Sequence, residues 1–215
     1  MEKAKLLLPI NIGILGAAIG CLADVLLLYT SNGGYETGDY RFLLDVGFIR
    51  LILGHYLGIL FIPLEVAGFW VIYQLILPIQ KRLANVIWYT AVYVAFLGVT
   101  YHATIGMVGS YLHRYDSTGQ AQELLQQWKW FYDPLAAILF VGFMIISSIL
   151  FYIFYFKQNQ WPKWMAFLNP FILYLLFGIL YLIWPAGGGL LLVAGFNLSI
   201  LINFFLIKKL LTTNF

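Results

Sequence analysis

Five ionisable side chains lie within long apolar stretches of this sequence, where their types and spacing could support chemistry. They are Asp24, Arg50, His55, Glu65 and His102. An ionisable group inside hydrocarbon is energetically costly, so it usually faces the interior of a helix bundle or a polar cavity. We expect these residues to contact a small polar or amphiphilic ligand, or an ion, in one intramembrane pocket that opens outward.

Three of these residues are expected at the same depth. Asp24 lies about five residues from the outer end of its predicted span, and His55 and His102 lie about nine residues from theirs. At a rise of about 1.5 Å per residue, all three are roughly 7 to 14 Å below the outer boundary. Arg50 would lie above them, and Glu65 would lie about 15 Å deeper than His55. Asn197, Ser199 and Asn203 in the last predicted span are neutral donors near this space.

One hypothesis makes Asp24, His55 and His102 the ligands of a divalent metal ion, with zinc the most suitable. Two imidazoles and one carboxylate match the ligand set of catalytic zinc sites, whose bound water ionises near neutral pH. Such a site would suit a metal-dependent membrane hydrolase that acts on lipid. In another hypothesis His55 and His102 are axial ligands of haem, because they lie on consecutive helices at matching depth.

A proton or ion relay in a small transporter is a further hypothesis. Histidine titrates near neutral pH, and Glu65 would be a deeper station for the proton. The structural alternative is that Asp24 pairs with Arg50, and that the histidines hydrogen-bond to tyrosines or to backbone carbonyls. The protein would then be a non-catalytic accessory or structural membrane protein. These alternatives stay open at the level of sequence, and so does the question of catalysis.

The elements that must position these residues follow from the composition. Of 215 residues, 62% are hydrophobic and only 10% are charged, whereas an ordinary soluble domain is nearer half apolar and a quarter charged. This composition excludes a soluble monomer and a disordered chain, and a single cysteine excludes a disulfide scaffold. The lipid bilayer is the expected partner. The formal charge of +3 indicates membrane topology, and no nucleic-acid partner is expected.

The sequence predicts an all-α polytopic membrane protein, a single domain formed by a bundle of six transmembrane helices. A bilayer core about 30 Å thick needs roughly 20 apolar residues per helix. The second predicted span contains Pro63 and is longer than a straight crossing needs, so a tilt, a kink or an interfacial entry turn would absorb the excess. The segment 112–133 is expected to be an outer loop with an amphipathic interfacial helix. The predicted spans are residues 6–29, 46–77, 83–111, 134–156, 165–184 and 190–207.

The basic residues predict the orientation of the bundle. Cytoplasmic loops of membrane proteins carry an excess of Lys and Arg. With both termini cytoplasmic in a multi-pass protein of the cell membrane, the outer side carries only Arg41, Arg50, Arg114 and Lys129. The cytoplasmic side then carries Lys3, Lys5, Lys81, Arg82, Lys157, Lys163, Lys208 and Lys209.

Four short stretches resemble an uncharacterised bacterial family of small six-helix membrane proteins. The resemblance spans most of the chain. It implies the helix count, and it carries no known activity and no catalytic residues. The stretches are Ala23 to Tyr29, Gly54 through Leu64, Trp164 through Pro170, and Gly195 to Ser199.

Overall fold

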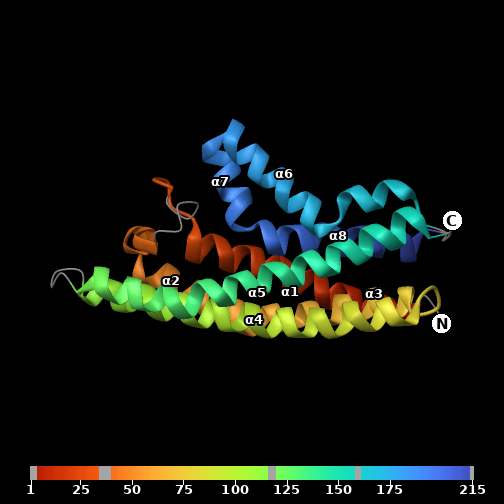
Figure 1. Ribbon diagram of the computed structural model, residues 1–215, viewed down its shortest axis with the longest axis horizontal. Helices are drawn as coiled ribbons and strands as arrows, with labels where there is room; N and C mark the ends of the chain where they lie inside the picture. The colour runs from red at the N-terminus through yellow and green to blue at the C-terminus, as the bar shows by residue number, and fades with distance from the viewer. Residues whose placement is uncertain (1–3, 34–39, 116–119, 158–160, 214–215) are drawn as a thin grey trace.

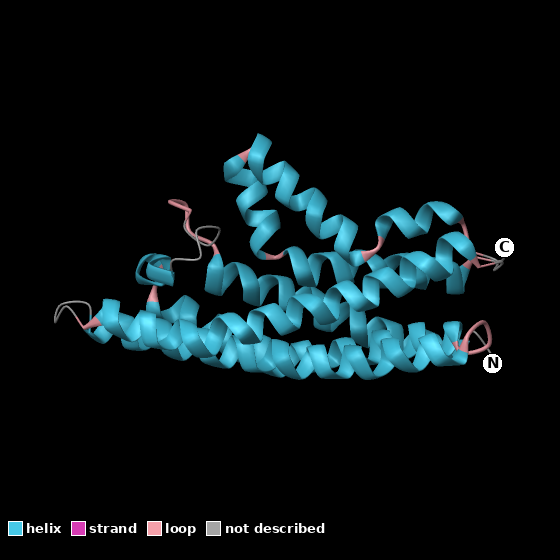
Figure 2. Ribbon diagram, in the orientation of Figure 1, coloured by secondary structure: helices cyan, strands magenta, loops and turns pink. Residues whose placement is uncertain are grey.

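The described residues form a helical protein without strands. The computed structural model describes residues 4–33, 40–115, 120–157 and 161–213 (Figure 2). The α-helices are α1 (Ala4–Leu28), α2 (Phe48–Phe61), α3 (Glu65–Ile76), α4 (Lys81–Tyr115), α5 (Ala121–Phe156), α6 (Pro170–Ile183), α7 (Pro185–Val193) and α8 (Gly195–Thr212). Short 3₁₀ segments are η2 (Tyr40–Asp45), η3 (Ile62–Leu64) and η5 (Lys163–Leu168).

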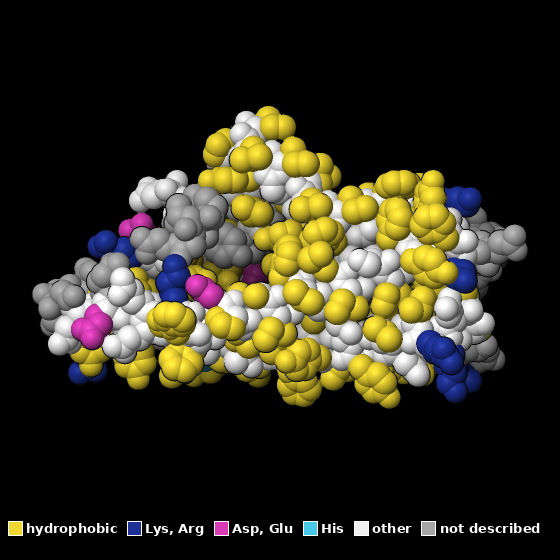
Figure 3. Space-filling view, viewed as in Figure 1, with side chains coloured by type: hydrophobic (Ala, Val, Ile, Leu, Met, Phe, Trp, Pro, Cys, Tyr) yellow, Lys and Arg dark blue, Asp and Glu magenta, His cyan; other side chains and the backbone are white. Residues whose placement is uncertain are grey.

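Among the described residues, five helical segments are long and apolar enough to span a membrane. They are Ala4–Leu28, Phe48–Ile76, Lys81–Tyr115, Glu123–Phe156 and Gly195–Thr212. Hydrophobic side chains cover the middle of the face seen in Figure 3, and the Lys and Arg side chains on that face lie toward the two ends. This all-helical, apolar fold fits an integral membrane protein. The ends of the chain lie at the same end of the molecule (Figure 1).

The second predicted span is interrupted at Pro63, and a new helix begins after it. Helix α2 ends at Phe61, η3 contains Pro63, and α3 starts at Glu65. Proline has no backbone N–H, and its ring clashes with the carbonyl four residues earlier, so a regular helix cannot pass through this position undisturbed. The break therefore places Glu65 in the first turn of α3, at the centre of the fold.

Helices α1 and α3 cross at close range through small residues. A Cβ atom added to Gly13 would lie 2.6 Å from Cα of Gly68, and one added to Gly16 would lie 2.9 Å from the backbone N of Glu65. Real Cβ atoms do not approach other atoms this closely, so both positions require glycine. The small-residue spacing in the first predicted span thus serves helix packing, as expected from membrane helices in general.

The segment 112–133 differs from its prediction as an outer loop with a separate interfacial helix. Helix α4 continues to Tyr115, and α5 starts at Ala121 and passes through Pro134 without a break. Residues 116–119 of this segment lie outside the described residues. Leu125 and Tyr132 are buried against the bundle, so the apolar face of this part of α5 packs on protein. Packing of that face stabilises one long helix where the sequence suggested two.

The last two predicted spans, 165–184 and 190–207, are each formed by two elements. The fifth consists of η5 and α6, separated by Asn169, and α6 has only 14 residues. The stretch 185–189 between these two predicted spans is helical, in α7, and the chain turns at Trp184. Helices α6 and α7 form a hairpin that projects from the side of the bundle (Figure 1). The hairpin requires Gly188, because an added Cβ would lie 2.3 Å from Cα of Tyr181.

Two apolar clusters form the core, with the polar residues between them along the helices. On α1, residues from Leu6 to Ala17 belong to the first cluster, and Leu27 and Leu28 belong to the second. On α4, residues 84–91 belong to the first cluster and residues 105–112 to the second. The ionisable residues of the candidate site lie in the layer between these clusters.

Candidate functional site

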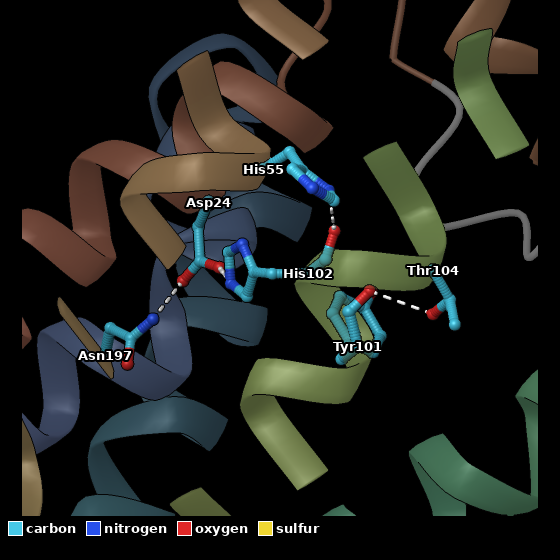
Figure 4. A network of polar contacts seen from close by, with 6 residues as sticks. All are labelled: Asp24, His55, Tyr101, His102, Thr104 and Asn197. Atoms are coloured by element: carbon cyan, nitrogen blue, oxygen red, sulfur yellow. Dashed lines mark hydrogen bonds and ion pairs between the residues drawn. The ribbon is translucent and has the colours of Figure 1, made fainter. Parts of the chain in front are cut away.

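Three polar side chains from three helices meet in the layer between the apolar clusters. Nε2 of His102 on α4 lies 3.1 Å from Oδ1 of Asp24 on α1. Nδ2 of Asn197 on α8 donates a hydrogen bond of 2.8 Å to Oδ2 of the same carboxylate. Figure 4 shows the three side chains converging. All three are buried, so two donors satisfy the Asp24 carboxylate away from water.

Two glycines make room for this group. A Cβ atom added to Gly58 on α2 would lie 2.1 Å from Nδ1 of His102, and one added to Gly20 on α1 would lie 2.9 Å from Cγ of Asn197. The imidazole therefore rests directly on the backbone of α2, and the amide rests on α1. The glycines fix the positions of both donors, which holds the Asp24 contacts in place.

Glu65 lies close to this group and is almost completely buried. Its exposed fraction is 4%, and its Oε1 atom has no hydrogen-bond partner within the part of the chain that the structure describes. Asp24 is close enough to interact with it electrostatically. A buried polar atom without a partner is uncommon in folded proteins and calls for an explanation. Here the unpaired oxygen belongs to a carboxyl group that lines a cavity.

The cavity beside these residues has a volume of about 430 Å³. Its polar side is formed by Asp24, Glu65, His102 and Asn197. Most of the remaining wall is apolar or aromatic, and it comes from α3, α4, α5, α6 and α8. The aromatic residues of the wall are Tyr40, Phe69, Tyr101, Tyr132, Phe143, Tyr174 and Phe196. A mostly apolar cavity of this size with a few convergent polar groups is typical of a small-molecule site.

His55 and Arg50 do not line this cavity. Nδ1 of His55 lies 3.3 Å from the backbone oxygen of His102, and its ring packs against Gly106, where an added Cβ would lie 2.7 Å from Cβ of His55. The Nη2 atom of Arg50 donates to the backbone oxygens of Val25 and Tyr29, at 2.9 and 2.6 Å. Arg50 thus satisfies carbonyls at the C-terminal end of α1.

The predicted convergence of Asp24, His55 and His102 on a metal ion is not formed. In the described residues no group of three His, Cys, Asp or Glu side chains could hold a metal ion. Asp24 meets His102 alone, because the His55 ring is directed to the backbone oxygen of His102 and packs against Gly106 (Figure 4). The same placement keeps the two imidazoles from facing a common space for haem. The predicted pair of Asp24 with Arg50 is replaced by the pair with His102.

The neutral donors expected in the last span take different partners. Asn197 contacts Asp24, whereas Nδ2 of Asn203 donates to the backbone oxygen of Leu168 at 2.6 Å. The hydroxyl of Ser199 donates to the backbone oxygen of Gly195 on its own helix. Only Asn197 therefore contributes to the polar side of the cavity, and the other two bond to backbone carbonyls.

An aromatic cluster closes the cavity at the end where η2 lies. The Tyr40 ring lies 4.7 Å from Trp128 and 5.1 Å from Tyr132, and Tyr132 lies 4.7 Å from Tyr101, measured between ring centroids. The Tyr40 hydroxyl donates to Oδ1 of Asp133 at 3.2 Å. Burial, the negative charge of Asp133 and this hydrogen bond raise the pKa of Tyr40 above its usual value.

Several residues of the site were not identified from the sequence. Tyr40 and Tyr132 fell in predicted loops, and Tyr174 and Phe196 were not separated from the many other aromatic residues. The spacing of Trp128 and Tyr132, one helical turn apart on the apolar face of the segment 112–133, was a signal for Tyr132. The contact of Gly58 with His102 joins two helices, and no local sequence pattern predicts it.

Residues 1–214 match a family model described as "Family of unknown function (DUF6796)". Because the match covers nearly the whole chain, the chain belongs to this family. Membership agrees with the resemblance to an uncharacterised family noted from the four short stretches. No curated protein and no solved structure matches the chain.

Proposed function

We propose that this member of the DUF6796 family binds a small amphiphilic ligand in the cavity between its helices. The observation that carries the proposal is the 430 Å³ cavity with Asp24, Glu65, His102 and Asn197 on one side and an apolar and aromatic wall around the rest. An amphiphile has the same division, with one polar head and an apolar body. Burial of the body supplies the free energy of binding, and the polar side orients the head.

The proposal is tested with three probes that share a ten-carbon chain and differ in the charge of the head. Decyltrimethylammonium is cationic, decanol is neutral and decanoate is anionic. The protein is placed in lipid nanodiscs, and the midpoint of thermal unfolding is measured at increasing probe concentration. Ligand that binds the folded state raises the midpoint in a saturable way. We expect at least one of the three probes to do so.

A pair of leucine variants shows whether the probe occupies the cavity. Gly98 on α4 lines the cavity, so the side chain of Gly98→Leu would occupy part of its volume. Gly178 on α6 does not line it, and nothing lies within 4 Å of an added Cβ there, so Gly178→Leu is the matched control. We expect the midpoint shift to persist in the control and to vanish in Gly98→Leu. Absence of any shift with all three probes, or an undiminished shift in Gly98→Leu, contradicts the proposal.

Transport of the ligand is a second candidate function, favoured by the buried carboxyl of Glu65. A carboxyl group without a cationic partner can take up or release a proton as the ligand enters or leaves, which couples the two movements. In sealed vesicles with an imposed pH gradient, transport predicts that decyltrimethylammonium dissipates the gradient and that Glu65→Gln prevents this. If the probe does not dissipate the gradient in wild-type vesicles either, the function is limited to binding.

The topology that goes with this function has six crossings, with both termini cytoplasmic. Helix α6 alone is about 21 Å long, shorter than a bilayer core of about 30 Å, but η5 adds roughly 12 Å to it. Helices α7 and α8 together form the sixth crossing. Helix α4 begins and helix α5 ends at the end of the molecule where both termini lie (Figure 1). The described basic residues in or beside these helix ends, η5 and the first and last helices are Lys5, Lys81, Arg82, Lys157, Lys163, Lys208 and Lys209, and Lys3 lies outside the described residues.

Single cysteines test this orientation in intact cells. The variants Ser31→Cys, after α1, and Lys81→Cys, at the start of α4, are made in a Cys21→Ser background, because Cys21 is the only cysteine. A membrane-impermeant maleimide is expected to label position 31 in intact cells and position 81 only after the cells are opened. Labelling of position 81 in intact cells would show that the orientation is the opposite of the one proposed.

A further inference from the structure

We infer that the ligand of this cavity is an organic cation, an amine or a quaternary ammonium with an apolar body. This inference rests on the proposed binding function and specifies the charge of the ligand. Within the described residues, the cavity wall holds two carboxyl groups and one imidazole, and it holds no Lys and no Arg. The charge of the wall is therefore unbalanced in favour of a positive guest.

Glu65 provides the free acceptor. Asp24 already accepts hydrogen bonds from His102 and Asn197, whereas Oε1 of Glu65 has no hydrogen-bond partner within the described chain. A carboxyl group that is 4% exposed and unpaired is stabilised when a cation comes to lie beside it. An anionic head would meet two carboxyl groups and neither Lys nor Arg in the described wall. Glu65 thus favours a cationic ligand over an anionic one.

The aromatic wall suits the same class of ligand. Aromatic faces attract ammonium groups, and quaternary ammonium ligands are commonly held between several rings. An aromatic wall also accepts an apolar body of variable shape, since it forms few directional contacts. The rings come from separate helices and therefore surround the space, and they include Phe69, Tyr101, Tyr132, Phe143, Tyr174 and Phe196.

Arginine and lysine elsewhere in the fold do not offset this charge. The guanidinium of Arg50 on α2 is directed to the backbone oxygens of Val25 and Tyr29. Lys129 lies with its Nζ 5.9 Å from the centroid of the Tyr40 ring, on the side of η2. Neither residue lines the cavity.

The affinities of the three ten-carbon probes test the inference in nanodiscs. We expect decyltrimethylammonium to bind at least tenfold more tightly than decanol and decanoate. If decanol or decanoate binds as tightly as the cation and Gly98→Leu still abolishes binding, the charge inference is wrong and the binding function stands. If no probe binds, the binding function itself fails.

Matched carboxyl-to-amide variants locate the source of the preference. Glu65→Gln keeps the size of the side chain and removes its charge, and we expect it to reduce the preference for the cation by at least tenfold. Glu123→Gln, at an exposed position in the first turn of α5, is the control and should leave the preference unchanged. Asp24→Asn is a second variant if Glu65→Gln does not fold. A cation preference that survives in both cavity variants would overturn the inference.

Discussion

Asp24 and His102 form a buried contact of 3.1 Å between α1 and α4, and the imidazole of His102 packs against the backbone of α2 at Gly58. The carboxylate accepts from Nε2 on one side and from the Asn197 amide on the other. Three helices are thus held at one level by a single carboxylate. The predictions below test this arrangement and the elements around it.

The contact of His102 with the backbone at Gly58 predicts that Gly58→Ala lowers the stability of the protein. The new Cβ would lie 2.1 Å from Nδ1, so the imidazole or α2 must shift, at a cost of about 1 to 3 kcal/mol in the free energy of unfolding. Thermal unfolding in nanodiscs measures the loss. Gly178→Ala, where an added Cβ meets nothing within 4 Å, is the control and should be neutral or slightly stabilising. If the clash with the imidazole is the cause, Gly58→Ala should cost much less stability in a His102→Ala background than in the wild type.

The hydrogen bond from Asn197 to Asp24 predicts energetic coupling between the two side chains. Loss of a buried hydrogen bond to a charged group costs about 1.5 to 3 kcal/mol. In a double-mutant cycle with Asp24→Ala and Asn197→Ala, we expect the combined loss to be smaller than the sum of the single losses by at least about 1 kcal/mol. Additive losses would show that the two residues stabilise the fold independently.

The side chain of Asn169 is expected to stabilise the start of α6 and with it the α6–α7 hairpin. Its side-chain oxygen accepts from the backbone N of Phe171 and of Ile172, at 3.1 and 3.2 Å, and its amide donates to the backbone oxygen of Ala166 at 2.7 Å. Asn169→Ala removes this N-cap and should cost about 1 to 2 kcal/mol. Asn169→Ser retains a capping oxygen and should cost less. Equal losses in both variants would rule out capping as the cause, and Asn11→Ala, at an exposed position on α1, is the control.

The raised pKa of Tyr40 predicts that the stability of the folded protein depends on pH in the alkaline range. Because the pKa of Tyr40 is raised in the folded state, the folded protein favours the neutral phenol, and this contribution is complete below about pH 10 and is lost as the pH rises further. Tyr40→Phe should cost a few tenths to about 1 kcal/mol at pH 8, after allowance for solvent. The difference from the wild type should shrink by pH 11.

The control for this titration is Tyr89→Phe, at an exposed position on α4. Its stability should follow the wild type across the same pH range. A constant difference between the wild type and Tyr40→Phe from pH 8 to pH 11 would show that the Tyr40 hydroxyl contributes no pH-dependent stability. The same measurement in Asp133→Asn should reduce the pH dependence, because the negative charge that acts on Tyr40 is removed.

Much of the fold could be predicted from the sequence because it follows from chain composition and local steric rules. Long apolar runs predict helices of membrane length, and the structure contains five of them. Proline disfavours a regular helix, and a kink at Pro63 was one of the alternatives for the long second span. The start predicted at Pro134 failed because packing of Leu125 and Tyr132 on the bundle keeps α5 continuous through a proline.

The sequence by itself determined the helical fold, and the rise per residue predicts the depth of the polar side chains in a membrane. Which direction each side chain faces was decided only by the tertiary structure. His55 and His102 were expected at the same depth, yet one ring lies against Gly106 and the other against Gly58 beside Asp24. The rotation of each helix is set by which neighbouring backbones can approach it closely. Contacts between residues far apart in the chain fix that approach, and no local pattern records them.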